Sequence, residues 1–320
     1  METGIVPRNE ALAAVRETAS QARDYAAHAR AENTVRAYRS DWRDWCAWCD
    51  ARSCSPLPAD PETVALYLTE RIETAKVSTL QRRLCAISQA HQLAGHPSPT
   101  KHPIVRAVWA GIRRVHGTAQ AGKAPTLTED LRRMVETLGS DLAGVRDRAL
   151  LLVGFAGAFR RSELVSLDRE DVTVTRSGLV LHLRRSKTDQ EGQGSKKGIP
   201  HGSAAPTCPV RSLQAWMRMA GIESGPLFRG VTRHGQLQPG RLSDRAVALV
   251  VKRAAAAAGL DPDLYSGHSL RAGLATSAAA AGASERAIMA QTGHKSVQMV
   301  RRYIRDGSLF RENAAGQVGL

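Results

Sequence analysis

The chain has 320 residues, a net charge of +15 at pH 7 and a sequence pI near 10.3. Hydrophobic residues make up 42% of it, which is enough for one large or two ordinary domains. Residues 1–121 contain 16 Lys and Arg against 12 Asp and Glu, and the remaining residues contain 29 against 18. This charge excludes a neutral surface. Because both halves share it, the favoured partner is a polyanion that contacts both, such as nucleic acid.

The five cysteines do not form a regular set. Cys46 and Cys49 have the spacing of half a metal site, but no second Cys pair or closely spaced His pair follows. Trp42, Trp45 and Trp48 give the same segment a helical spacing, so the thiols are predicted to be core residues. The sequence has no secretory signal and no run of about 18 apolar residues, which predicts a cytoplasmic protein with reduced thiols and no membrane partner.

The first 31 residues are rich in Ala, Arg and Glu, so we expect a helical or partly disordered N-terminal arm. Apolar residues at helical spacing then predict four short helices, which would form a small bundle over residues 32–116. The first predicted helix starts at Asn33 or Thr34 and ends before Ser53. The second starts at Asp60 and Pro61, with Val64, Leu66, Tyr67 and Leu68 facing inward. The third runs from Ser78 or Thr79 to Gly95, and the fourth from Pro103 to Val115.

Small residues and Lys123 give residues 117–125 the composition of a linker, and a second domain is predicted over residues 126–320. The predicted fold is therefore mainly α with two domains, a helical bundle and a mixed α+β domain with a small antiparallel sheet. The elements expected in the second domain are a helix from Thr128, an apolar helix over Arg146–Ala156, strands at Val172–Val174 and Leu179–Leu183, a polar loop over Asp189–Gly198, a short strand at Ile199–His201, and helices from Pro209 onward with breaks at 221–226 and 259–267.

Six polar residues of the second half suggest one site for phosphodiester chemistry. Fixed Arg and His donors stabilise the negative charge that develops on an attacked phosphate, and a tyrosine can be the nucleophile. A phenol has a pKa of about 10, so neighbouring positive charge or a base must activate it. The six residues are Arg160, Lys187, His268, Arg271, His294 and Tyr303.

Five short strings contain these residues and resemble the active-site motifs of the tyrosine recombinase (phage integrase) family. Any one of them would be a weak signal, but five in order at compatible spacings are a strong one. The likeness also includes Trp45–Cys49 and extends over nearly everything after Glu32, which implies a core-binding (SAM-like) DNA-binding domain at 32–116 and a catalytic domain at 126–320. The strings are Phe159–Leu164, Ser186–Lys187, Gly267–Gly273, Gly293–His294 and Arg302–Arg305.

The resemblance implies a role for each residue of the site. Arg160 and Arg271 would clamp the scissile phosphate, because a guanidinium stays charged and offers paired donors in a plane. Tyr303 would be the nucleophile. His268, on the same helix face as Arg271, would accept a proton or bind the phosphate. His294 resembles the second histidine of most family members.

The same motifs also imply roles for Glu163 and Lys187. Glu163 would support Arg160 or a neighbouring histidine, with an ordinary helix-surface acid as the alternative, and Arg161 is interpreted as a surface arginine. Lys187 resembles the general acid that protonates the departing 5′ oxygen. Lys196 and Lys197 occupy the same predicted loop and could do this instead, but Arg185–Thr188 fits the family motif, so Lys187 is preferred.

The implied reaction is a transesterification through a 3′-phosphotyrosyl bond, which needs no cofactor, neither metal nor ATP. The implied partner is double-stranded DNA with a specific target site, on which a homotetramer would assemble two sites into a synaptic complex. We expect a nucleoid-associated protein. The segment Leu309–Leu320 would dock into a neighbouring protomer or remain a frayed tail.

DNA contacts are expected from both domains. Ser243 is predicted to cap a helix through Val251, and Arg245 in its first turn resembles a family arginine that reads guanine. In the bundle most contacts would go to phosphate, so salt should weaken binding. The candidate residues there are Arg36, Arg39, Arg43, Gln81, Arg82 and Arg83.

Two other interpretations fit part of the pattern. A type IB topoisomerase uses the same chemistry to relax supercoils, but the compact bundle and the expected C-terminal docking segment count against it. A non-catalytic DNA-binding regulator could share the fold, but it would not need polar residues at all six positions of the site.

Overall fold

The computed structural model describes residues 17–18, 21, 31–119, 122–186, 189 and 192–307. The chain divides into two compact units between residues 121 and 122. The architecture is mainly helical with small antiparallel sheets, as the sequence predicts. Within the described ranges, no helix has the length and apolar content needed to cross a membrane.

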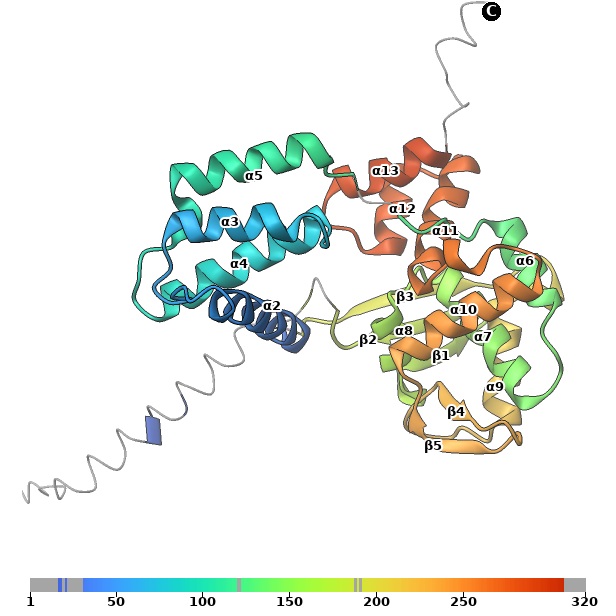
Figure 1. The fold of residues 1–320 in the computed structure, drawn as a ribbon. Helices are drawn as coiled ribbons and strands as arrows, with labels where there is room; N and C mark the ends of the chain where they lie inside the picture. Colours follow the sequence, from blue (N-terminus) through green and yellow to red (C-terminus); the bar gives the residue numbers. More distant parts are fainter. Residues whose placement is uncertain are drawn as a thin grey trace, which may run out of the picture. The chain divides into compact units, whose positions relative to one another are not determined.

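The first unit contains a bundle of helices (Figure 1), which pack around an aromatic core. Trp45 and Trp48 stack with ring centroids 5.8 Å apart, and Tyr67 meets Trp45 edge-on at 4.9 Å. These rings are almost fully buried, so the helical tryptophan spacing identified the core face correctly. The elements are α2 (Glu32–Asp50), α3 (Pro61–Arg71), α4 (Val77–Leu93), the 3-10 turn η1 (Pro99–Lys101) and α5 (Pro103–His116).

Two local predictions for the bundle are wrong. Helix α2 begins at Glu32 and not after a cap at Asn33 or Thr34, and its N-cap position, Ala31, has no side chain that could form a capping bond. Leu66 is 64% exposed, because the α3 face that packs into the bundle carries Tyr67 and Leu68 instead. Both errors concern the exact boundary or face of a helix whose existence the periodicity predicts.

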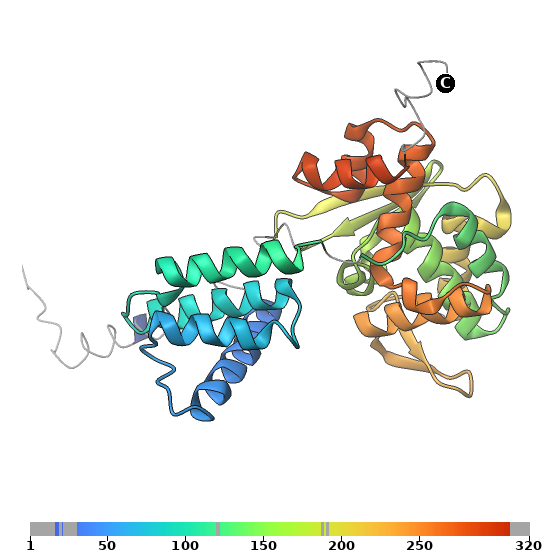
Figure 2. The same cartoon turned by 45° about the horizontal axis from the view of Figure 1, so that its top comes forward.

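The second unit packs helices against a three-stranded sheet, with a two-stranded sheet at the edge of the unit (Figure 2). Its elements are α6 (Thr128–Glu136), α7 (Leu142–Ala156), α8 (Arg161–Ser166), η2 (Arg169–Asp171), β1 (Val172–Thr175), β2 (Gly178–Leu183), β3 (Ser195–Pro200), η3 (Ala205–Thr207), α9 (Pro209–Met219), β4 (Arg229–Val231), β5 (Leu237–Arg241), α10 (Asp244–Ala257), η4 (Pro262–Leu264), α11 (Gly267–Ala280), α12 (Glu285–Thr292) and α13 (Val297–Gly307).

Helix α7 is buried on most of its surface, which explains why its sequence is apolar without a clear polar face. Leu150, Leu151 and Val153 are fully buried in the core that α7 shares with α9 and α11. The helix ends at Ala156, so its burial fixes the position of the turn that follows and leads to Arg160.

The main sheet has the order β1-β2-β3, with both pairs antiparallel. The two-residue alternation of β3 points Lys197 and Ile199 into the unit, 7% and 1% exposed, and leaves Lys196 on the outside. The predicted loop over Asp189–Gly198 is therefore too long, because β3 starts at Ser195. The hairpin of β4 and β5 was also missed, since its strands are short and β5 contains Pro and Gly.

A glycine in α11 allows this helix to pack directly against a neighbouring backbone. A Cβ atom at Gly273 would lie 1.8 Å from the carbonyl oxygen of Thr126, whose amide donates to Ser269 O at 2.9 Å. We predict that Gly273→Ala lowers the free energy of unfolding by about 2 kcal/mol or more, because the helix must move away. Chemical denaturation with hydrogen exchange at the α11 amides would measure this. Gly111→Ala in α5 is the control, since nothing lies within 4 Å of its Cβ position, and equal effects of both changes would contradict the prediction.

Candidate active site

Arg160 stands at the N-cap of α8 and is held there by Glu163. One carboxylate oxygen of Glu163 accepts a hydrogen bond from the backbone N–H of Arg160 at 2.9 Å, and the other accepts from the Arg160 guanidinium. Glu163 is only 4% exposed, so this charge pair is partly shielded from solvent. Of the two predicted partners of Glu163, an arginine or a histidine, the structure places Arg160 in contact. The guanidinium is thus fixed before any ligand arrives.

Arg271 lies in the first turns of α11 and is 1% exposed. Its Nη1 donates to the carbonyl of Ala158 at 2.8 Å, two residues before Arg160. Burial, followed by the charge of Arg160, lowers the pKa of Arg271 to about 10, so the group remains charged at neutral pH. The structure therefore brings the two predicted phosphate-binding arginines together from α8 and α11.

His294 follows α12 through Gly293, which has a left-handed φ of 67°. Arg271 Nη2 donates to His294 Nε2 at 3.1 Å, because an arginine has no acceptor. The ring proton must then lie on Nδ1, which donates to Thr292 Oγ1 at 2.8 Å, while Thr292 Oγ1 donates to Ile288 O at 2.7 Å. Burial, followed by the charges of Arg271 and Arg160, lowers the pKa of His294 to about 4. This histidine is neutral at physiological pH, with a defined tautomer.

Tyr303 reaches the same site from α13. Val300 is fully buried with Ala275, Ala279 and Ile288, and this packing docks α13 onto α11 and α12. Both views show α13 beside these helices (Figures 1 and 2). The Tyr303 hydroxyl lies 3.0 Å from Nε2 of His268, an exposed residue on α11. Five of the six predicted residues therefore converge: Arg160, His268, Arg271, His294 and Tyr303.

The sixth residue, Lys187, lies outside the described residues, so its predicted role as general acid stays a prediction. The two alternative lysines separate clearly, since Lys196 is exposed and Lys197 is buried. Lys197 Nζ donates to the carbonyls of Gly157 and Gln291 at 2.7 and 2.6 Å. Burial, the largest cause, lowers its pKa to about 8. Its place on the core face of β3 would have been visible from its two-residue spacing to Ile199.

The predicted DNA contacts occupy two kinds of position. Arg36, Arg39, Arg43, Gln81, Arg82 and Arg245 are exposed. Arg83 is different: its side chain is 15% exposed and lies 3.1 Å from Asp44, so it takes part in holding the bundle together. Arg82 also pairs with buried Asp41, at 2.6 Å. The cap of the Arg245 helix is confirmed, since Ser243 Oγ accepts from Ala246 N.

Arg161 behaves as the sequence suggested, with its guanidinium 3.8 Å from Asp244 and its stem against Gly267 at the start of α11. The segment Leu309–Leu320 lies outside the described residues.

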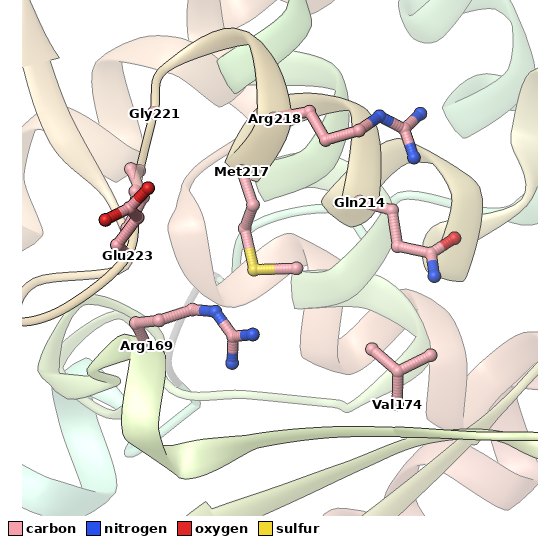
Figure 3. Close-up of a pocket in the computed structure, with 8 residues that line it drawn as sticks. Arg169, Val174, Gln214, Met217, Arg218, Gly221 and Glu223 are labelled. Atoms are coloured by element: carbon pink, nitrogen blue, oxygen red, sulfur yellow. The ribbon is translucent and has the colours of Figure 1, made fainter.

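A separate cavity of about 400 Å³ lies between β1, η2 and α9. Figure 3 shows Arg169, Gln214, Met217 and Arg218 around it. None of the converging polar residues lines this cavity. The candidate active site is therefore defined by its polar side chains and not by this hollow.

Comparisons with known proteins agree with this geometry. Residues 126–308 match the Phage integrase family, and residues 24–96 match its N-terminal SAM-like domain. The integrase/recombinase xerD homolog of Selenomonas ruminantium is 45% identical over 90% of this chain and 86% of its own length. The chain therefore belongs to the phage integrase family of tyrosine recombinases.

Two more distant proteins extend the comparison. Recombinase cre of Escherichia phage P1 is 27% identical over 86% of this chain and 84% of its own length. The chain is thus less similar to Cre than to the xerD homolog. A lambda integrase tetramer bound to a Holliday junction shares the fold, with a TM-score of 0.62 over 91% of this chain and 76% of that chain at 16% identity.

Because the pKa of His294 is lowered in the folded state, the free energy of unfolding should depend on pH. Its ordinary value is 6.5 and its folded value is about 4, so between these the unfolded chain binds more protons than the folded one. The free energy of unfolding must therefore fall as the pH drops through this window. Between pH 7 and pH 5, we expect the free energy of unfolding of His294→Gln to fall by on the order of 1 kcal/mol less than that of wild type. Chemical denaturation at both pH values would measure this difference. Exposed His201→Gln is the control, and an unchanged pH dependence in His294→Gln would contradict the assignment.

Proposed function

We propose that this protein is a site-specific DNA recombinase that cleaves and rejoins DNA through a 3′-phosphotyrosyl bond to Tyr303, without a metal or ATP. One observation carries the proposal: the Tyr303 hydroxyl lies 3.0 Å from His268, on the helix that also carries the buried cation Arg271. A nucleophile, a proton acceptor and a phosphate-binding cation thus meet in one site, as transesterification requires.

In the first step Arg160 and Arg271 bind the non-bridging oxygens of the scissile phosphate. Their charges stabilise the extra negative charge of the pentavalent transition state. The Tyr303 oxygen attacks phosphorus and transfers its proton to His268 Nε2. The bond from phosphorus to the 5′ oxygen breaks, and this oxygen receives a proton from Lys187.

In the second step a 5′ hydroxyl attacks the 3′-phosphotyrosyl phosphorus. Its proton returns through the general acid position, and His268 returns a proton to the Tyr303 oxygen as it leaves. Because one phosphodiester is exchanged for another, the bond energy is conserved and no nucleotide cofactor is consumed. When the hydroxyl comes from a partner duplex, the strands are recombined.

The neutral state of His294 fits this chemistry. Its Nε2 accepts a hydrogen bond from Arg271 and therefore orients that guanidinium without adding a competing charge. A protonated His294 would repel Arg271 and could not accept its N–H. Thr292 fixes the tautomer from the other side of the ring.

The proposed partner is a double-stranded DNA target site, bound by both units, with Arg245 reading bases and the exposed bundle cations contacting phosphate. The net charge of +15 supports this role. We also propose that four protomers assemble on two sites, because the fold matches a lambda integrase tetramer bound to a Holliday junction.

Loss of the nucleophile is the first test. A target duplex selected from a randomised pool and nicked beside the cleavage position would trap the covalent adduct on a denaturing gel. We predict that Tyr303→Phe forms no adduct but binds the duplex within about twofold of wild type, because only the attacking oxygen is removed. Buried Tyr265→Phe is the control and should keep the adduct. An adduct in Tyr303→Phe would refute the nucleophile. Cleavage without strand exchange would favour the topoisomerase, and binding without any adduct in wild type would favour the regulator.

Salt provides a second test, of the phosphate contacts. If roughly six or more phosphates are neutralised, affinity should fall about 1,000-fold or more between 50 and 200 mM salt. We predict that Arg39→Ala lowers the slope of log K against log salt by about one, and that Arg245→Ala relaxes base preference at one position. Fluorescence anisotropy with a series of duplexes would measure both. A salt-independent affinity would contradict this binding mode.

A further inference from the structure

Lys197 is a cation enclosed in the second unit at a point where no acid pairs with it directly among the described residues. Its two hydrogen bonds go to backbone carbonyls, those of Gly157 and Gln291, and its Nζ lies 5.0 Å from the Phe159 ring centroid. Ile199 occupies the same face of β3 two residues later. An apolar residue such as that isoleucine would fill this position at lower desolvation cost, so packing alone does not explain a lysine.

The two carbonyls belong to the segments that present the active-site side chains. Gly157 lies in the turn that leads from α7 to Arg160, and Gln291 lies at the end of α12 just before His294. On the other side of these turns, Arg271 bonds to both the carbonyl of Ala158 and the ring of His294. Lys197 and Arg271 therefore bridge the same two turns, one from β3 and one from α11.

A third contact strengthens this bridge. Gln291 Nε2 donates to the carbonyl of Ala156 at 2.6 Å and to the carbonyl of Gly198 at 3.1 Å. The end of α12 is thus tied to the end of α7 and to β3 by its side chain as well as by Lys197. Around the ammonium stand the attracting carboxylate of Glu163 and the repelling guanidinium groups of Arg271 and Arg160.

We propose that Lys197 is a positioning residue for DNA cleavage: its ammonium locks the turn before Arg160 to the turn before His294, and so fixes the distance between the groups that bind the scissile phosphate. The role rests on the proposed recombinase function. It differs from that of the general acid, because both carbonyl bonds direct Nζ to the protein backbone. Removing it would leave one buried and one partly buried carbonyl without this donor and let the two turns separate.

The test compares Lys197→Met with wild type in single-turnover cleavage of the nicked target duplex. Methionine has a similar length and no donor, so the core remains filled while the lock is lost. We expect the cleavage rate to fall about 100-fold, as for a misplacement of about 1 Å, with duplex affinity within about threefold of wild type and an unchanged circular dichroism spectrum of the folded protein. Exposed Lys101→Met, in the first unit, is the control for the loss of a lysine and should cleave like wild type.

A duplex with sulfur in place of the 5′ bridging oxygen separates positioning from proton donation. A thiolate leaves without a proton, so the loss of a general acid is rescued by this substrate and the loss of a positioning residue is not. We expect Lys197→Met to stay slow on the sulfur duplex. Full rescue would overturn the proposal and make Lys197 the proton donor.

Gln291→Leu provides an independent arm, because it keeps Lys197 and removes the side-chain bonds to Ala156 and Gly198. We expect Gln291→Leu to cleave at least tenfold more slowly than wild type. If Lys197→Met does not fold, the cleavage rate of Gln291→Leu alone tests whether the two turns must be held together. Wild-type rates in Lys197→Met, or in a folded Gln291→Leu, would refute the lock. Absence of any adduct in wild type would instead refute the recombinase function, so the two failures are distinguishable.

Discussion

The site depends on a buried guanidinium with no directly bonded carboxylate among the described contacts. Arg271 is 1% exposed, and its bonds go to a carbonyl and a neutral imidazole. Arg160 differs, since Glu163 offsets its charge. Burying the charged Arg271 side chain costs desolvation free energy, and the lowered pKa of Arg271 has the same cause. A phosphate would neutralise this charge, which Glu163 offsets only in part, so the same arrangement that weakens the folded state would strengthen transition-state binding.

The elements around Arg271 each have a separate task. Helix α11 supplies Arg271 and His268 at a spacing that puts both on one face, and Gly273 lets this helix approach the backbone at Thr126. Helix α13 packs on α11 through Val300 and carries Tyr303 to His268. The turns after α7 and α12 are held by backbone and side-chain bonds. Rigid elements therefore hold the proposed catalytic side chains in place before substrate binds.

The sequence predicted the helical core well, and five of the six proposed site residues lie close together in the structure, but the sequence did not predict their protonation states. Ordered motifs identified Arg160, His268, Arg271, His294 and Tyr303, because each needs a particular residue type. They could not show that His294 is neutral, since its tautomer depends on a guanidinium and a threonine brought together by the fold. Lys197 looked like a loop residue because the start of β3 is polar and contains glycine. The β4–β5 hairpin was missed for a similar reason, as its pairing gains little from apolar alternation.

Mass spectrometry of the trapped adduct would test the central claim most directly. After nuclease and trypsin digestion, the account predicts that the peptide Tyr303–Arg305 carries a nucleotide joined through its 3′ phosphate to the tyrosine oxygen. Attachment to any other residue, or through a 5′ phosphate, would contradict the convergence of Tyr303, His268 and Arg271 as the catalytic centre.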